Sequence, residues 1–209
     1  MSYTALINEL RFLMSNDKLR RAVDKRVMEF VSFNRRDKQR VFSELSFCIL
    51  TANFNAKGAM KIQSSVDFFN VSASDLRQKL KQLGHRFPNK RAEFIIEARK
   101  KIDDIVDVIN ATIPTEEKRE WLVKNIKGIG YKEASHFLRN IGFLDLAIID
   151  FHIVDVLIKY RVVEERKSLT KSRYIEIENK LKEISKAINL PLGELDLYLW
   201  YMETGNILK

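Results

Sequence analysis

The chain has 209 residues, of which 45% are hydrophobic and 10% aromatic. A chain of this length and apolar content can bury a substantial core, which excludes a disordered tail. It contains 7 glycines and 3 prolines, too few for the many turns of a β-sandwich, a barrel or a Rossmann-type sheet. The 37 basic and 28 acidic residues give a net charge of +9, which favours a polyanionic partner such as nucleic acid.

The single cysteine, Cys48, limits the chemistry. One cysteine cannot form an intramolecular disulfide, a four-cysteine zinc site or a cysteine-ligated iron–sulfur cluster. The start of the chain lacks the basic and apolar regions of a signal peptide, and no apolar run approaches the ~20 residues of a membrane span. We therefore expect an intracellular protein without membrane contact.

Apolar residues recur at helical spacing and nowhere alternate as in a strand, so the sequence predicts an all-α fold. One clear stripe consists of Val41, Phe42, Leu45, Cys48, Ile49 and Ala52. A shorter helix is expected after a cap at Ser72 and ends near Gly84. Pro88 then opens a long helix, whose apolar spacing extends to about Asn110.

Two further helices begin at prolines. Acidic residues follow Pro114 in the first turn of one, and Pro191 opens the last. Basic residues cluster at several places, for example Lys90–Arg91, where a solvated helix face is the simplest interpretation. No repeat or flexible linker divides the chain, so any two-lobed organisation must arise from how the helices pack.

Residues 126–134 read IKGIGYKEA and stand between two predicted helices, one ending near Asn125 and one starting near Tyr131. Gly128 and Gly130 allow a tight hairpin, and the first-turn amides of the next helix point outward without helical partners, which suits a phosphate. A nucleotide-cofactor loop would need a preceding strand and a longer glycine pattern. The spacing predicts a helix–hairpin–helix DNA-binding motif with Ile126 and Ile129 as its apolar packing positions; an ordinary interhelical turn is the alternative.

Lys132 follows the hairpin, in the first turn of the second helix, and Asp150 follows 18 residues later within the segment IDFHI. Asp150 is placed to cap the next helix, and simple capping is the alternative to a catalytic role. Non-catalytic hairpin motifs also carry a lysine at this position. The pair at this spacing is therefore more informative than either residue alone.

The segment GIGYK followed by IDFHI resembles the endonuclease III superfamily of DNA glycosylases. LGHRFPNKRAEFI (83–95) and ILTAN (49–53) are similar to further parts of that superfamily, and the resemblance covers roughly residues 40–209. The chain lacks the cysteines of an iron–sulfur loop and has no room for an N-terminal β-rich domain. What remains resembles the compact archaeal-type (second-family) 8-oxoguanine DNA glycosylase/AP lyase, which ends in a lysine, here Lys209.

The resemblance implies a two-lobed helical fold with a helix–hairpin–helix motif and an active site in the cleft between the lobes. It divides the chain into a central lobe at about residues 38–145, which contains the motif at 124–140. The second lobe is formed by about residues 1–37 together with 146–209.

The resemblance also implies a bifunctional reaction. Lys132 attacks C1′ of the damaged nucleotide to form a Schiff base, and β-elimination then cleaves the strand at the AP site. The attacking amine must be neutral, which partial burial and the positive end of a helix favour. Asp150 stabilises the positive charge that builds on the sugar as the base leaves.

The same resemblance assigns residues to the DNA and to the flipped base. The implied DNA-binding residues are Gly128, Ile129, Gly130, His152, Asn53 and Arg86. The implied base-recognition residues are Phe87, Trp200 and Lys209. Each has a structural alternative as a helix cap, a core aromatic or a solvated tail.

The expected partner is double-stranded DNA that contains an oxidised base, bound by a monomer in the cytoplasm or at the nucleoid. No cofactor or divalent metal is implied, although the backbone carbonyls of Lys124, Ile126 and Ile129 are a candidate site for a monovalent cation. Two alternatives stay open. One is an endonuclease III-like glycosylase/lyase for oxidised pyrimidines, and the other is a non-catalytic helix–hairpin–helix DNA-binding protein.

Overall fold

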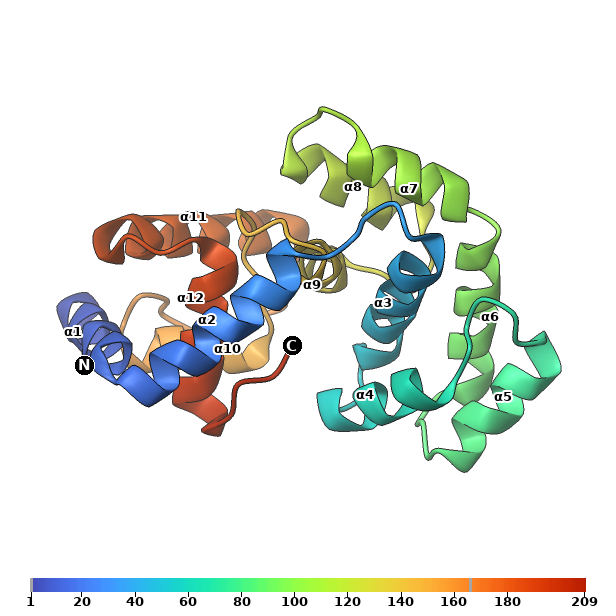
Figure 1. The fold of residues 1–209 in the computed structure, drawn as a ribbon. Helices are drawn as coiled ribbons and strands as arrows, with labels where there is room; N and C mark the ends of the chain where they lie inside the picture. Colours follow the sequence, from blue (N-terminus) through green and yellow to red (C-terminus); the bar gives the residue numbers. More distant parts are fainter. Residues whose placement is uncertain (1, 166) are drawn as a thin grey trace. The chain divides into compact units, whose positions relative to one another are not determined.

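The computed structural model describes residues 2–165 and 167–209. These residues contain twelve α-helices and no strand, so the predicted all-α fold is confirmed. The helices form two compact units (Figure 1). We call Met1–Ser32 with Gly142–Lys209 the terminal unit and Phe33–Ile141 the central unit.

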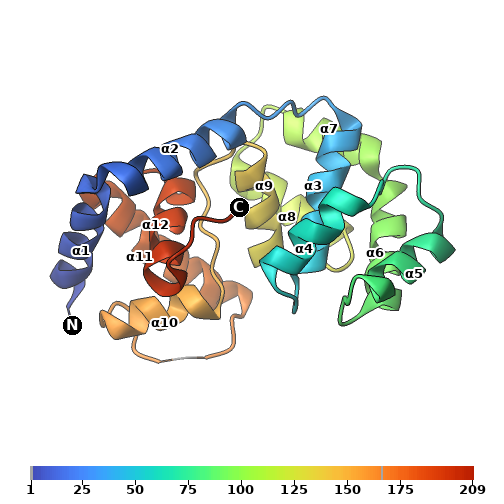
Figure 2. The ribbon, with the colours of Figure 1, turned by 60° about the horizontal axis from the view of Figure 1, so that its bottom comes forward.

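The central unit is built around one buried helix, α3. Its helices are α3 (Lys38–Thr51), α4 (Ala56–Ser65), α5 (Ala73–Gln82), α6 (Pro88–Arg99), α7 (Ile102–Asn110), α8 (Thr115–Asn125) and α9 (Tyr131–Asn140). Helix α3 contacts α4, α6, α7 and α9, while α5 packs on α6 and α8 packs on α9 (Figure 2).

Helices surround α3 on several sides, so its buried surface is wider than the apolar stripe that the sequence predicts. Ten of its 14 residues are buried, including polar residues between the apolar ones. Glu44 accepts hydrogen bonds from the side-chain amides of Asn140 (2.6 Å) and Gln63 (3.1 Å). A buried carboxylate needs such donors, since an unsatisfied one would be costly.

The single helix expected from Pro88 to about Asn110 is wrong, because the segment forms two helices. Helix α6 ends at Arg99 and α7 begins at Ile102, with Lys101 between them outside the helical region (φ −108°, ψ 15°). The α6 helix packs on α3 and α5, whereas α7 packs on α3 and α8. No glycine or proline marks this break; tertiary packing imposes it.

The terminal unit is built around α12. Its helices are α1 (Tyr3–Ser15), α2 (Asp17–Val31), α10 (Phe151–Lys159), α11 (Lys171–Ile188) and α12 (Leu192–Thr204). Helix α12 contacts α1, α2, α10 and α11. Its N-cap is Pro191, as the sequence predicts, and its buried face runs from Leu192 to Leu199.

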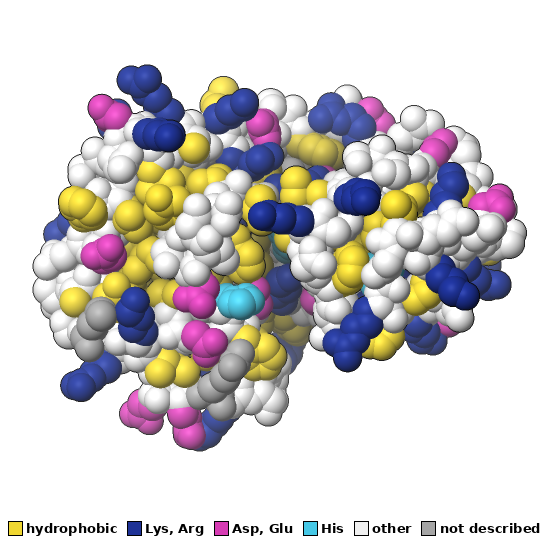
Figure 3. Space-filling model, turned by 90° about the horizontal axis from the view of Figure 1, so that it is seen from below, with side chains coloured by type: hydrophobic (Ala, Val, Ile, Leu, Met, Phe, Trp, Pro, Cys, Tyr) yellow, Lys and Arg dark blue, Asp and Glu magenta, His cyan; other side chains and the backbone are white. Residues whose placement is uncertain are grey.

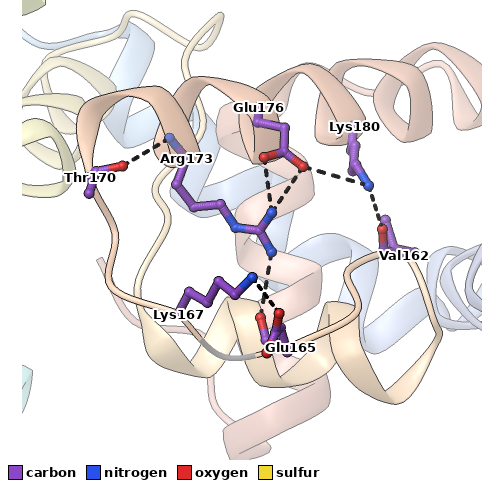
Figure 4. Close-up of polar contacts among 7 residues, drawn as sticks. All are labelled: Val162, Glu165, Lys167, Thr170, Arg173, Glu176 and Lys180. Carbon is purple, nitrogen blue, oxygen red and sulfur yellow. Dashed lines mark hydrogen bonds and ion pairs between the residues drawn. The ribbon is translucent and has the colours of Figure 1, made fainter.

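Side chains of α11 hold the segment that joins α10 to α11 (Figure 4). Nη1 of Arg173 donates to both carboxylate oxygens of Glu176 (3.0 and 2.9 Å), and its Nη2 donates to the carbonyl of Glu165 (3.5 Å). Nζ of Lys180 donates to the carbonyl of Val162 (3.0 Å). These bonds tie the connection to α11 at two points.

Within the part of the chain that is described, no helix combines the length and hydropathy required to cross a bilayer. The surface carries many basic side chains. On the face shown in Figure 3, Lys and Arg side chains are scattered over the central unit, at the right, and do not gather into one patch.

Candidate functional site

The glycine-rich hairpin joins α8 to α9, at the place that the sequence predicts. Gly128 has a φ of +83°, which side chains rarely adopt. A Cβ atom at Gly128 would lie 2.3 Å from Cδ2 of Phe94. Ile126 and Ile129 are 2% and 6% exposed and anchor the hairpin, which confirms them as its packing positions. Both the backbone conformation and the contact with Phe94 therefore require glycine at position 128.

Helix α9 begins directly after the hairpin. The N–H of Gly130 donates to Oε2 of Glu133 (3.1 Å), which closes the N-terminus of the helix. Lys132 is the second residue of α9 and is partly buried. The first-turn amides beside it have no carbonyl acceptor within the helix, so this end of α9 suits an anion.

Tyr131, the neighbour of Lys132, is held from two directions. Its hydroxyl donates to the carboxylate of Glu120 on α8. The guanidinium of Arg119 lies 5.2 Å from the centroid of its ring. These contacts fix the first turn of α9, and with it the backbone that carries Lys132.

Asp150 is the N-cap of α10, as predicted. Its Oδ1 accepts the backbone N–H groups of His152 (2.9 Å) and Ile153 (3.1 Å). Its Oδ2 accepts no hydrogen bond from the described residues. The cap thus fixes the carboxylate through one oxygen and leaves the other for a positively charged ligand.

His152 and Trp200 lie together, on α10 and α12. Their ring centroids are 5.4 Å apart and the rings are nearly perpendicular (86°). Nδ1 of His152 lies 3.8 Å from Oε1 of Glu203. Nε1 of Trp200 is buried and has no hydrogen-bond partner among the described residues. A buried N–H without an acceptor is rare in proteins, so this indole is a candidate donor for a ligand.

The C-terminal tail follows α12. Gly205 ends the helix in the left-handed conformation (φ +68°). Beyond it, Ile207, Leu208 and Lys209 are each partly buried. The end of the chain is therefore not a fully solvated tail.

Asn53 follows α3, and Phe87 precedes α6. Asn53 is exposed and has a φ of +59°. Phe87 is 42% exposed, which excludes a core position for it. The guanidinium of the exposed Arg86 lies 5.1 Å from the ring centroid of Phe87. The central unit thus presents a polar side chain on one loop and an aromatic–arginine pair on another.

The sequence-predicted residues fall into two sets. The central unit carries Lys132, Asn53, Arg86, Phe87 and the hairpin with Gly128, Ile129 and Gly130. The terminal unit carries Asp150, His152, Trp200 and Lys209. Within these sets, contacts join Arg86 to Phe87, His152 to Trp200, and Asp150 to the backbone of His152.

In the described ranges, no three His, Cys, Asp or Glu side chains are grouped to hold a metal ion. The carbonyls of Lys124, Ile126 and Ile129 stay a predicted monovalent-cation site. Nζ of Lys101 donates to the carbonyl of Asn125 (2.8 Å), beside two of them. One positive group is thus already bound by a carbonyl at the end of α8.

Two buried polar residues beneath these loops, His85 and Arg91, are missing from the sequence-based assignment. They are 4% and 8% exposed. The expectation that Lys90–Arg91 forms a solvated face is wrong for Arg91, whose guanidinium turns inward and donates to the carbonyl of Ala52 (2.8 Å). The available signal was their place in the segment 83–95, which carries part of the family resemblance.

Comparisons with known proteins identify the family of the chain. The family model of 8-oxoguanine DNA glycosylase matches residues 23–190. A protein of Korarchaeum cryptofilum named 8-oxoguanine DNA glycosylase/AP lyase is 50% identical over 212 residues, which cover 100% of both chains. The crystal structure of Methanocaldococcus jannaschii 8-oxoguanine glycosylase/lyase in complex with a 15mer DNA containing 8-oxoguanine has a TM-score of 0.94 and 47% identity, covering 98% of this chain and 100% of that one.

The 8-oxoguanine DNA glycosylase of Thermotoga maritima has a TM-score of 0.90 and 37% identity, and 99% of each chain is covered. The family model spans more than half of the chain, and the relatives match it along nearly its full length. The chain belongs to the 8-oxoguanine DNA glycosylase family.

Proposed function

We propose that this chain excises 8-oxoguanine from double-stranded DNA and then cleaves the strand at the abasic site. The observation that carries this proposal is the position of Lys132, which is partly buried in the first turn of α9 directly after the hairpin. The hairpin and the first-turn amides suit a DNA phosphate, so a bound strand would bring a sugar near the lysine. The names of the relatives support the substrate.

In the proposed reaction, Lys132 is the nucleophile. Its neutral Nζ attacks C1′ of the damaged nucleotide, and the bond from C1′ to the base breaks as the base takes up a proton. Loss of a proton from nitrogen and opening of the sugar leave an imine between Nζ and C1′. Removal of a C2′ proton then expels the 3′ phosphate, and water releases the lysine.

We assign charge stabilisation to Asp150. Positive charge builds on the sugar as the base leaves, and a fixed anion lowers the barrier for that step. The cap bonds to His152 and Ile153 hold Oδ1. Oδ2 is then the oxygen that faces the developing charge.

We assign the flipped base to Phe87, Trp200 and Lys209. Flipping costs a few kcal/mol, and stacking on an aromatic side chain returns about 1–3 kcal/mol per base. The buried Nε1 of Trp200 supplies a hydrogen-bond donor for a carbonyl oxygen of the base. The partial burial of Lys209 supports a place for the chain terminus beside the base.

The remaining residues are proposed to bind the DNA backbone and to fill the gap that the base leaves. The backbone contacts are assigned to Gly128, Ile129, Gly130, His152 and Arg86, and the gap to Asn53. We propose that the protein acts as a monomer, in the cytoplasm or at the nucleoid. Measuring the protein–duplex stoichiometry by light scattering tests the monomer, and a 2:1 complex would contradict it.

A monovalent cation on the carbonyls of Lys124, Ile126 and Ile129 would strengthen phosphate binding at the hairpin. Duplex affinity measured at constant ionic strength should be higher in K⁺ or Na⁺ than in a bulky organic cation. Equal affinities would contradict the cation site.

Borohydride trapping tests the function. Wild type is incubated with duplexes that contain 8-oxoguanine, thymine glycol or undamaged guanine. Lys132→Gln is run beside Lys127→Gln, a matched control, since Lys127 lies in the same hairpin and pairs with Glu97 at the surface (3.1 Å). We expect a covalent adduct on the 8-oxoguanine duplex alone, lost in Lys132→Gln and kept in Lys127→Gln.

An adduct with thymine glycol alone would favour the alternative function, an endonuclease III-like glycosylase/lyase for oxidised pyrimidines. Tight duplex binding without any adduct would reduce the chain to a non-catalytic DNA-binding protein.

A further inference from the structure

The last turn of a helix leaves its carbonyls without N–H partners in the helix itself. This applies to the carbonyls at the C-terminal end of α3. Here three consecutive carbonyls find partners. The carbonyl of Leu50 lies 3.0 Å from Nε2 of His85, that of Thr51 accepts the N–H of Phe54 (3.1 Å), and that of Ala52 accepts from Arg91.

His85 contacts two loops through its two ring nitrogens. A carbonyl oxygen can only accept, so the nitrogen facing Leu50 carries the proton. Nδ1 then accepts the backbone N–H of Phe87 (3.1 Å). Burial, aided by the charge of Arg91, lowers the pKa of His85 and keeps the ring neutral. Because the tautomer is fixed, one ring holds the end of α3 and the start of α6.

The residues on both sides of Asn53 are immobilised by the same cluster. On one side, Nη2 of Arg91 donates to the carbonyl of Ala52 (2.8 Å). On the other, the ring of Phe54 packs against the ring of His85, with centroids 4.3 Å apart. Between them, Asn53 is held in the left-handed conformation with its side chain exposed.

We infer that His85 and Arg91 are positioning residues, which hold Asn53 and Phe87 as one preorganised pair before DNA binds. The inference rests on the proposed function, in which Asn53 fills the gap and Phe87 stacks on the flipped base. Neither His85 nor Arg91 needs to touch DNA in this role. Their effect on the reaction arises through the two exposed side chains, because small displacements of such groups slow catalysis strongly.

Two substitutions at position 85 separate the two hydrogen bonds of the His85 ring. A glutamine amide reaches the place of Nε2, so His85→Gln keeps a donor for Leu50 and loses the acceptor for Phe87. An asparagine oxygen reaches the place of Nδ1, so His85→Asn keeps the acceptor and loses the donor. Arg91→Met removes the bond to Ala52.

Arg99→Met is the matched control. Arg99 lies on the same helix and also binds loop carbonyls, those of Phe68 (3.2 Å), Phe69 (3.0 Å) and Val71 (2.8 Å). Its loop contains none of the proposed DNA contacts. The control therefore measures how much stability is lost when an arginine no longer binds loop carbonyls, without any effect on the proposed DNA contacts.

The readouts are the single-turnover excision rate, the melting temperature and the fluorescence of 2-aminopurine placed opposite 8-oxoguanine, which reports insertion of a side chain into the gap. We expect His85→Gln to slow excision about tenfold with wild-type fluorescence. We expect His85→Asn and Arg91→Met to lose most of the fluorescence change. Arg99→Met should lower the melting temperature and leave both functional readouts unchanged.

The positioning role would be overturned if the three variants lost no more function than Arg99→Met does for the same decrease in melting temperature. A wild-type protein that neither excises 8-oxoguanine nor changes the fluorescence would overturn the proposed function, and the inference with it. The two failures are distinct, since the second appears before any variant is made.

Discussion

The two units build their cores from different side chains. Among the described residues, twelve of the fourteen buried polar or charged residues lie in the central unit, and the terminal unit has Glu178 and Asp196. The central helices show the same contrast. Helix α3 buries Glu44, Ser46 and Thr51 among its apolar residues, whereas the buried face of α12 is mainly leucine and carries one charged residue, Asp196.

The two units also hold their functional side chains in different ways. In the central unit, buried cations bind carbonyls at helix ends, as Arg91 does at Ala52, the C-cap of α3, and Lys118 does at Val108 in the last turn of α7 (3.1 Å). Removing such a partner strands a buried carbonyl, at a cost of about 1–3 kcal/mol. In the terminal unit, Asp150 is fixed by its own helix, through amides two and three residues away. Long-range polar bonds occur in the terminal unit too, since the N–H of Ile149 donates to the hydroxyl of Tyr174 (3.2 Å), but the Asp150 carboxylate itself is held by local capping.

The local arrangement at Asp150 can be broken chemically without breaking the cap. Asparagine caps helices as well as aspartate, so Asp150→Asn should keep the melting temperature. Loss of the carboxylate should slow single-turnover excision by about 10²–10³-fold. Asp150→Ala should add a stability loss of about 1 kcal/mol, because it removes the cap as well. Near-normal excision by Asp150→Asn would reduce this residue to a helix cap.

Two glycines of the central unit offer a comparison, Gly128 in the hairpin and Gly84 after α5. Gly128 and Gly84 both have positive φ, but a Cβ at Gly84 meets nothing within 4 Å, whereas one at Gly128 meets Phe94. Gly84→Ala should cost about 1 kcal/mol and Gly128→Ala about 2–4 kcal/mol, because the second adds overpacking. Urea unfolding measures both. Equal losses would mean that Phe94 moves aside to make room for the new methyl group without a loss of stability.

The C-terminal tail tests the contribution of the terminal unit to base recognition. Deleting Lys209 should reduce the preference for 8-oxoguanine over guanine roughly 5- to 150-fold, the range expected for a lost buried hydrogen bond. Affinity for undamaged duplex should change less. Excision rates on the two duplexes and filter binding give these quantities. An unchanged lesion preference would remove the tail from the base site.

The polar core of the central unit also predicts a pH dependence of stability. Burial lowers the pKa of His85 below its ordinary value of 6.5. As the pH falls below about 6.5, the unfolded chain takes up the proton first, so the free energy of unfolding decreases. The slope from this residue is at most about 1.4 kcal/mol per pH unit. His85→Gln should show a shallower slope in denaturant unfolding, and a slope equal to wild type would contradict the buried neutral ring.

The fold class and the family were predictable because their signals are local. Helical spacing predicts the all-α class, and GIGYK with IDFHI lies within 26 residues, from Gly128 to Ile153. The cap of Asp150 and the packing positions Ile126 and Ile129 follow from the same short segments, and all are confirmed. Each depends on residues a few positions apart.

Other features depended on contacts that no local pattern records. The break between α6 and α7 follows from their different packing partners, so periodicity through Lys101 gave one helix where there are two. The bonds from His85 to Leu50 and from Arg91 to Ala52 join residues 35 and 39 positions apart. Charged residues are usually exposed, and for Arg91 that general rule was misleading.

Locating the trapped adduct shows directly whether Lys132 is the nucleophile. Wild type is reduced with borohydride on an 8-oxoguanine duplex, digested with nuclease and protease, and the peptides are sequenced by mass spectrometry. We expect the residual sugar on Nζ of Lys132, in the first turn of α9. A sugar on any other amine would contradict it.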